Sequence, residues 1–127
     1  MRIAQVAPLF ESVPPKYYGG TGRVVSYLTE ELIRQGHEVT LFASGDSETK
    51  AGLMAACRRS LRLDKHCVDQ LAHQILMLER VFQRAAEFDV NRFPLSRRQS
   101  VPHVTTLHGR LDIPDLIPLY QEFRTCR

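Results

Sequence analysis

The first 46 residues alternate between short apolar runs and one amphipathic repeat. Ile3 to Ala7 is mostly apolar and stops at a proline, which predicts a strand buried on both faces of a parallel sheet. After a loop rich in proline and glycine, apolar residues recur every three or four positions between Thr21, which can serve as an N-cap, and Gly36, which can end a helix. The β-rich run Glu38 to Ala43 follows. This order indicates a βαβ unit.

The remaining pattern is less regular. The segment from Ser47 to Lys65 is ambiguous, and a strand over residues 57–63 is one interpretation, although three arginines interrupt its alternation. Apolar positions from Val68 to about Glu87 predict a second helix. Phe88 to Val90 begins a strand that polar residues and a proline soon interrupt, a short helix follows over residues 94–99, and the β-branched run His103 to Leu107 predicts another strand.

Short strands that alternate with helices indicate an α/β domain with a Rossmann-like, open, mostly parallel sheet and helices on both faces. A length of 127 residues fits one such domain. We assign residues 1–123 to the domain and residues 124–127 to a tail.

Composition narrows the classes of function. The formal charge of +3 comes from 17 basic and 14 acidic residues that are scattered along the chain, and there is no tryptophan. A nucleic-acid binder would gather its basic residues beside stacking aromatics, so we expect no nucleic-acid partner. No run approaches the roughly 20 apolar residues of a membrane span. Three cysteines without C-x-x-C spacing or a secretory leader favour a reducing cytoplasm.

Two loops are candidates for chemistry, because ligands of open parallel sheets bind at the carboxyl ends of the strands. In the first, a helix start with free N–H groups can hold an anion such as phosphate; its residues are Gly19, Gly20, Thr21, Gly22 and Arg23. A plain turn is the commoner explanation for such glycines. In the second, His108 follows a strand with Gly109 beside it, and Asp112 comes soon after. A histidine there can donate a hydrogen bond or carry a proton, or it can be a surface or capping residue.

No metal site is predicted. The spacing of the candidate ligands does not give two clean pairs; they are Cys57, His66, Cys67 and His73. The loop carboxylates at the expected ligand edge are interpreted as solvated side chains; they are Glu11, Asp46 and Asp112.

Several segments together resemble the opening of family 4 glycosyltransferases. They are Met1 to Pro8, Tyr18 to Val25, Leu32 to Asp46 and Val104 to Gly109. The resemblance implies the amino-terminal half of a GT-B fold, in which two Rossmann-like domains face each other across a cleft. It also implies transfer of a sugar from a nucleotide diphosphate sugar to an acceptor with retention of configuration, generally without a metal or other cofactor.

The resemblance also implies roles for residues. The amino-terminal domain chiefly shapes the acceptor side. Gly19 and Gly20 would bring the helix start close to the donor diphosphate or the acceptor, and His108 would face the sugar near the reacting centre as the catalytic residue. The strand order 3-2-1-4-5 would place the fourth strand beside the first.

Three departures from the family pattern qualify these expectations. Gly22 stands where relatives have glutamate, which removes a carboxylate and is expected to loosen the turn. The strand after Val90 is shortened, and the chain ends at Arg127, before the donor-binding domain. We therefore expect no autonomous activity unless another chain supplies the missing domain. The alternatives are a non-catalytic, Rossmann-like module that binds a nucleotide or sugar, and a protein that serves only in interactions.

Overall fold

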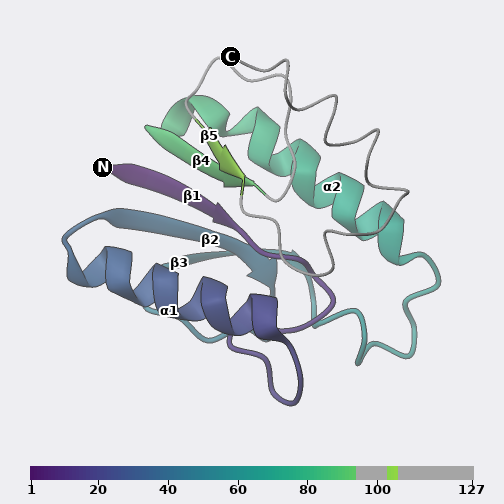
Figure 1. Ribbon diagram of the computed structural model, residues 1–127. Helices are drawn as coiled ribbons and strands as arrows, with labels where there is room; N and C mark the ends of the chain where they lie inside the picture. The colour runs from purple at the N-terminus through teal and green to yellow at the C-terminus, as the bar shows by residue number, and fades with distance from the viewer. Residues whose placement is uncertain (94–102, 106–127) are drawn as a thin grey trace, which may run out of the picture.

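The computed structural model describes residues 1–93 and 103–105. Within these residues the chain forms a five-stranded, parallel sheet with the order β3-β2-β1-β4-β5 (Figure 1). The elements are β1 (Arg2–Val6), α1 (Gly20–Arg34), β2 (Glu38–Ser44), β3 (Gly52–Cys57), α2 (Gln70–Gln83), the 3-10 helix η1 (Ala85–Glu87), β4 (Val90–Phe93) and β5 (His103–Thr105). The α/β class and the strand order 3-2-1-4-5 are both confirmed.

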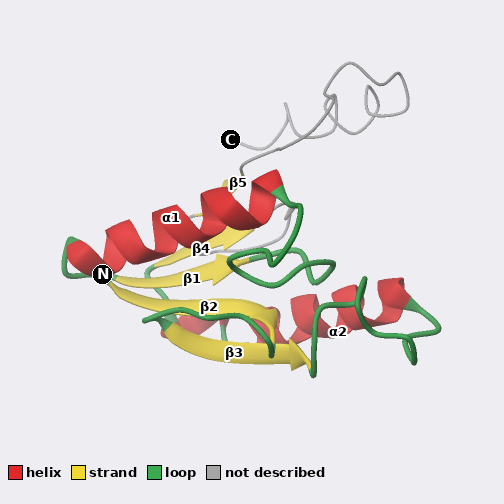
Figure 2. Ribbon diagram, turned by 90° about the horizontal axis from the view of Figure 1, so that it is seen from below, coloured by secondary structure: helices red, strands yellow, loops and turns green. Residues whose placement is uncertain are grey.

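The two long helices cover opposite faces of the sheet (Figure 2). Each face therefore has its own apolar core. The core under α1 consists of Ala7, Val13, Val25, Leu41 and Ala43. The core under α2 consists of Ala4, Val6, Leu9, Phe42, Leu61, Met77, Val81 and Phe88. Because neighbouring strand residues point to opposite faces, β2 contributes Phe42 to one core and Leu41 and Ala43 to the other.

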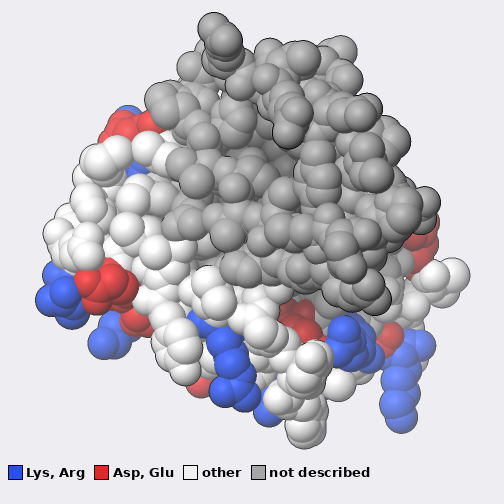
Figure 3. Space-filling model, in the orientation of Figure 1, with Lys and Arg blue, Asp and Glu red and all other residues white. Residues whose placement is uncertain are grey.

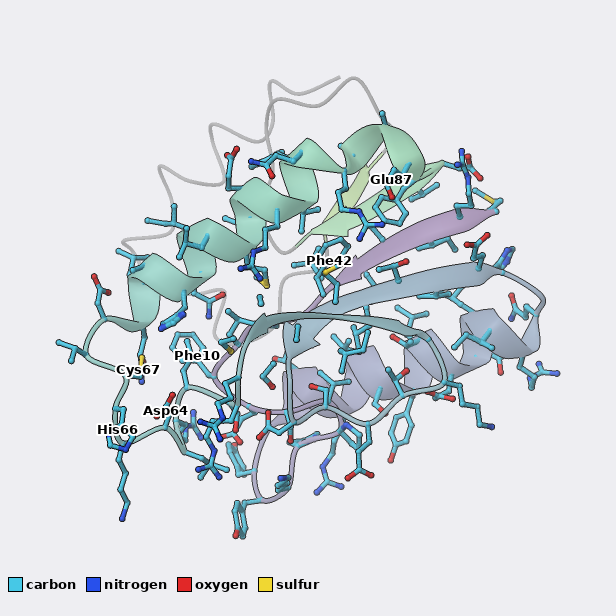
Figure 4. All side chains as sticks on the ribbon, turned by 180° about the vertical axis from the view of Figure 1, so that it is seen from behind. Phe10, Phe42, Asp64, His66, Cys67 and Glu87 are labelled. Atoms are coloured by element: carbon cyan, nitrogen blue, oxygen red, sulfur yellow. The ribbon has the colours of Figure 1, made fainter. Side chains whose placement is uncertain are left out.

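The centre of the sheet is buried as the apolar runs predict. Residues 3–6 of β1 are all buried, and β1 pairs with β2 over five positions, from Arg2 with Glu38 to Val6 with Phe42. The Phe42 ring lies between the sheet and α2, edge-on to the Phe88 ring at a centroid distance of 6.0 Å (Figure 4). This contact ties the middle of β2 to the segment that enters β4.

Helix α1 begins one residue before the predicted cap. Gly19 is the N-cap and no side chain caps the helix, so the assignment of Thr21 as N-cap is wrong. The predicted end is confirmed: Gly36 has φ 86, its N–H donates to the Ile33 carbonyl at 2.9 Å, and the His37 N–H donates to the Leu32 carbonyl at 3.0 Å. These two bonds form a Schellman motif, which needs a left-handed residue at that position.

The third strand lies earlier than residues 57–63. Strand β3 is Gly52–Cys57, in register with β2 from Thr40 opposite Gly52 to Ala43 opposite Ala55. Residues after it form a loop in which Leu61 is buried and its N–H donates to the Leu9 carbonyl at 2.9 Å. Glycine and alanine have weak strand preference, so pairing with β2 outweighs the local pattern.

Helix α2 is shorter than the predicted span from Val68 to Glu87. Asp69 caps its start, and the helix gives way to η1 after Gln83. Val68 lies before the cap and is fully exposed. The longer helix was predicted from the spacing of apolar residues. That spacing cannot detect the change to 3-10 geometry at Ala85.

Strand β4 starts at Val90 rather than Phe88 and continues through the polar residues that were expected to interrupt it. It lies between β1 and β5, with Val90 opposite Ile3. Asp89 locks the entry: its N–H donates to the Arg2 carbonyl at 2.8 Å, and its carboxylate accepts from the Arg2 N–H at 2.8 Å. Backbone pairing is indifferent to side-chain polarity, so these residues can fill the strand.

Strand β5 accounts for His103–Thr105 of the predicted run to Leu107. It pairs with β4 from Asn91 opposite His103 to Phe93 opposite Thr105. The remaining two residues of that run and the helix predicted over 94–99 lie outside the described residues.

Candidate functional site

The carboxyl ends of β1, β2 and β3 meet at one edge of the sheet because these strands are parallel. The loop after β1 leads into α1, so the predicted ligand segment Gly19–Arg23 starts at this edge (Figure 1). Gly19 is the N-cap and the other four residues form the first turn of the helix. The structure thus brings one of the two predicted loops to the expected position.

The first turn of α1 is open to solvent at Gly20 and Arg23 and buried at Gly22. Gly20 is exposed, and a Cβ built on it would have no heavy atom within 4 Å. The first turn contains no acidic residue, and Arg23 is exposed without an ion pair in the described part of the chain. The first N–H groups of a helix have no acceptor within the helix, so this turn combines free donors with the positive end of the helix dipole. It is suited to an anion.

Gly22, which stands where relatives have glutamate, packs against the loop before α1. It is buried, and a Cβ at this position would lie 3.2 Å from the Ser12 carbonyl oxygen and 3.2 Å from Pro15 Cδ. The absence of a side chain therefore lets α1 pack directly against the preceding loop. A larger residue would have to push these two groups away.

The two described loop carboxylates are not solvated, contrary to the expectation. Only 12% of the Glu11 side chain is exposed, and its Oε1 lies 2.7 Å from an Arg62 guanidinium nitrogen. The Asp46 carboxylate accepts hydrogen bonds from the Ser60 N–H at 2.8 Å and from the Ser60 hydroxyl at 3.0 Å. Both acids are partly buried between loops, and their partners neutralise or satisfy them.

Asp46 has an altered acidity. Burial acts to raise the pKa of its carboxyl, but hydrogen bonds from Ser44 and Ser60 outweigh burial and hold the pKa below its ordinary value of 3.8. Lys16, in the loop before α1, places its Nζ 3.9 Å from Asp46 Oδ2. Asp46 therefore stays ionised near neutral pH and joins the ends of β2 and β3 to the loop after β1.

The described cysteines show no sign of activated chemistry. Burial raises the pKa of the Cys57 thiol, and the nearby charges of Asp46 and Asp64 act in the same direction. Its sulfur donates to the Arg59 carbonyl at 3.1 Å. A thiol with a raised pKa is protonated at neutral pH and is a weak nucleophile.

His66 and Cys67 lie beside each other on the loop before α2, with Asp64 close by (Figure 4). The Asp64 side chain accepts from the His66 N–H at 2.9 Å, and its carbonyl accepts from the Cys67 N–H at 3.2 Å. Residues 1–93 and 103–105 contain no group of three His, Cys, Asp or Glu side chains placed to hold a metal ion.

Charge is mixed over the surface. On the face shown in Figure 3, Lys and Arg side chains alternate with Asp and Glu side chains. In the described residues, none of the helices has the length and apolar character needed to cross a bilayer.

The second predicted loop cannot be placed, because His108, Gly109 and Asp112 lie outside the described residues. Sequence reasoning also missed a set of buried polar side chains beneath the carboxyl edge: Ser12, Ser44, Ser47 and Ser60. Serine is common in loops, and nothing in its spacing signals burial. Their positions depend on which loops the sheet brings together.

Comparisons with known proteins identify the family of the chain. The sequence model described as Glycosyltransferase Family 4 matches residues 18–125. Among solved structures, the chain is similar to one titled "Crystal structure of AviGT4, a glycosyltransferase involved in Avilamycin A biosynthesis", with 29% identity and a TM-score of 0.45, over 72% of this chain and 24% of that chain. It thus spans about a quarter of that relative's length. No curated protein gives a significant match. Since the family model covers most of the sequence, the chain belongs to glycosyltransferase family 4.

Proposed function

We propose that this domain forms one side of the cleft of a glycosyltransferase. In the proposed reaction, a sugar is transferred from a nucleotide diphosphate sugar to an acceptor with retention of configuration. Family membership supports the class of reaction. The observation that carries the proposal is the open first turn of α1, which presents backbone N–H groups, an exposed Gly20 and the Arg23 guanidinium at the carboxyl edge of the sheet. Gly19 to Arg23 would face the donor diphosphate or a polar acceptor.

His108 is proposed as the catalytic residue, with Gly109 and Asp112 as further substrate contacts. The support is their position in the sequence, within seven residues of the end of β5, which runs parallel to β4 at the edge of the sheet. An imidazole at a strand's carboxyl end can hydrogen-bond the transferring sugar. The expected compartment is the cytoplasm, and the expected partners are the sugar nucleotide and an acceptor.

A transfer and hydrolysis assay with a panel of uridine, guanosine and thymidine diphosphate sugars tests the reaction. His108→Ala should reduce turnover by about a hundredfold, as expected on loss of a group that acts on the reacting centre. His73→Ala, on α2, is the matched control and should stay within about twofold. Equal effects would remove His108 from its proposed role.

Binding of a nucleoside diphosphate without turnover would favour the alternative, a non-catalytic module. The two are separated by running the same panel with a donor-binding domain of the family added in trans. Turnover that appears only with the second domain supports a half-cleft, and binding without turnover in both conditions supports the module.

A further inference from the structure

Residues 47–51 form a strap that leaves β2, passes the loop after β1 and reaches α1. At its start, the Ser47 hydroxyl accepts a hydrogen bond from the Val13 N–H at 2.9 Å, and the Glu48 N–H donates to the Val13 carbonyl at 2.7 Å. The strap therefore satisfies both backbone groups of Val13, a residue that is 1% exposed.

The other end of the strap grips the middle of α1. The Glu30 carboxylate accepts from the Thr49 hydroxyl at 2.9 Å and from the Lys50 N–H at 3.0 Å. The Thr49 hydroxyl in turn accepts from the Ala51 N–H at 3.1 Å. The strap thus joins the helix and the loop before it by separate bonds.

In the sequence, Val13 lies between Ser12 and Pro15, the two residues against which Gly22 packs. The Ser12 carbonyl and the Pro15 ring are the atoms that a Cβ at Gly22 would meet, and the Ser12 hydroxyl donates to the Pro14 carbonyl at 2.8 Å. A shift of Val13 would therefore move the surface against which the first turn of α1 packs. Ser47 is 9% exposed, and within the described residues its hydroxyl bonds to the Val13 N–H and, at 3.3 Å, to the Ser44 hydroxyl.

We propose that Ser47 is a positioning residue for the first turn of α1. It acts through Val13, Ser12 and Pro15 and sets where the N–H groups of Gly20 to Arg23 point. Ser47 itself touches no ligand. For ligand affinity the inference rests on the proposed function; for the order of the helix start it stands on the hydrogen bonds alone.

The test compares wild type with Ser47→Ala in the intact chain by two measurements. The first is the affinity for pyrophosphate, the group shared by all nucleoside diphosphates, followed by NMR shifts of the amides of residues 20–23. The second is hydrogen exchange at the Arg23 amide, which donates to the Gly19 carbonyl at 3.2 Å and so reports on the first turn. For wild type and the Ser47 variants, exchange is normalised to amides of α2; for Val81→Ala, the rates are compared without this normalisation.

Loss of a buried acceptor leaves the Val13 N–H unpaired, so Ser47→Ala should weaken pyrophosphate binding about fivefold or more and speed Arg23 exchange about tenfold. Ser47→Thr keeps the hydroxyl and should restore both to within about twofold. Val81→Ala, in the core on the opposite face, is the control for general loss of stability: it should speed exchange in α2 and leave pyrophosphate affinity unchanged.

Ser47→Ala values within twofold of wild type in both measurements would overturn the proposal, and so would failure of Ser47→Thr to restore them. If wild type binds no pyrophosphate, the proposed anion contact fails, while Arg23 exchange still decides the positioning role. Should Ser47→Ala not fold, Ser47→Cys keeps the volume with a weak acceptor, and the same Arg23 exchange ratio above or below twofold decides the matter.

Discussion

At the scale of single residues, Asp46 is a loop carboxylate that stabilises the fold. Its two oxygens accept from the N–H and the hydroxyl of Ser60, which is fully buried. Truncation of Asp46 leaves both donors without that acceptor. We expect Asp46→Ala to lower the free energy of unfolding by about 1–3 kcal/mol at pH 7, measured by urea denaturation.

The same residue predicts a pH dependence. Because the pKa of the folded Asp46 carboxyl is below its ordinary 3.8, its contribution is complete above that value and is lost as the pH falls through the folded pKa. The difference in stability between wild type and Asp46→Ala should therefore shrink in acid below about pH 3.8. A difference that is constant down to pH 2 would contradict the role of the ionised form.

Thr29 lies on the buried side of α1, where its hydroxyl lowers the stability of the fold. It is fully buried, and its hydroxyl has no hydrogen-bond partner among the described residues. Thr29→Val keeps the shape and removes the unpaired group, so the free energy of unfolding should rise by about 1 kcal/mol.

Thr49→Val is the matched comparison, because the Thr49 hydroxyl is bonded to Glu30 and to the Ala51 N–H. The same substitution there should destabilise the protein. Chemical denaturation of both variants decides the point, and equal signs would contradict the assignment of Thr29 as unpaired.

At the scale of secondary-structure elements, the stability of helix α2 depends on its N-cap. The Asp69 carboxylate accepts from the Leu71 N–H at 2.9 Å and from the Ala72 N–H at 3.2 Å. Asp69→Ala should cost about 0.5–2 kcal/mol of stability and increase hydrogen exchange in the first turn of α2. Asp69→Asn keeps an acceptor and should lose little; an equal loss would indicate that charge, rather than the cap bond, supports the helix.

Helix α1 solves the same problem differently. It has no side-chain cap at its start, whereas its end is closed by the Schellman motif at Gly36. The starts of the two helices therefore differ. The start of α2 is capped and serves packing, whereas the start of α1 keeps free N–H donors at the carboxyl edge of the sheet.

At the scale of the whole molecule, the packing of α2 on the sheet buries one of two neighbouring residues and leaves the other exposed. Met77 is 2% exposed in the core against the sheet, and Leu76 is 56% exposed. Met77→Ala should lower the free energy of unfolding by about 2–5 kcal/mol. Leu76→Ala should change it by less than about 1 kcal/mol. Thermal or urea unfolding checks both values, and similar losses would contradict the packing of α2 on this face.

Much of the fold was predictable because local and global preferences agree. The apolar runs gave β1 and β2, the three-to-four repeat gave α1, and glycine at position 36 gave its end. Where they disagree, prediction failed: β3 uses Gly52 and Ala55, and β4 runs through Asn91 and Arg92, since in both cases a neighbouring strand supplies the pairing.

The candidate site divides along the same line. Sequence alone determined the glycine segment at the start of α1, the parallel α/β class and the family, because these depend on turn-forming residues, periodicity and ordered motifs. Only the tertiary structure decided that Asp46 and Glu11 are partly buried and paired, that Gly22 packs against Ser12, and that Ser47 bonds to Val13. These contacts join loops separated in sequence, and they exist only once the parallel sheet has brought the carboxyl ends of its strands to a common edge.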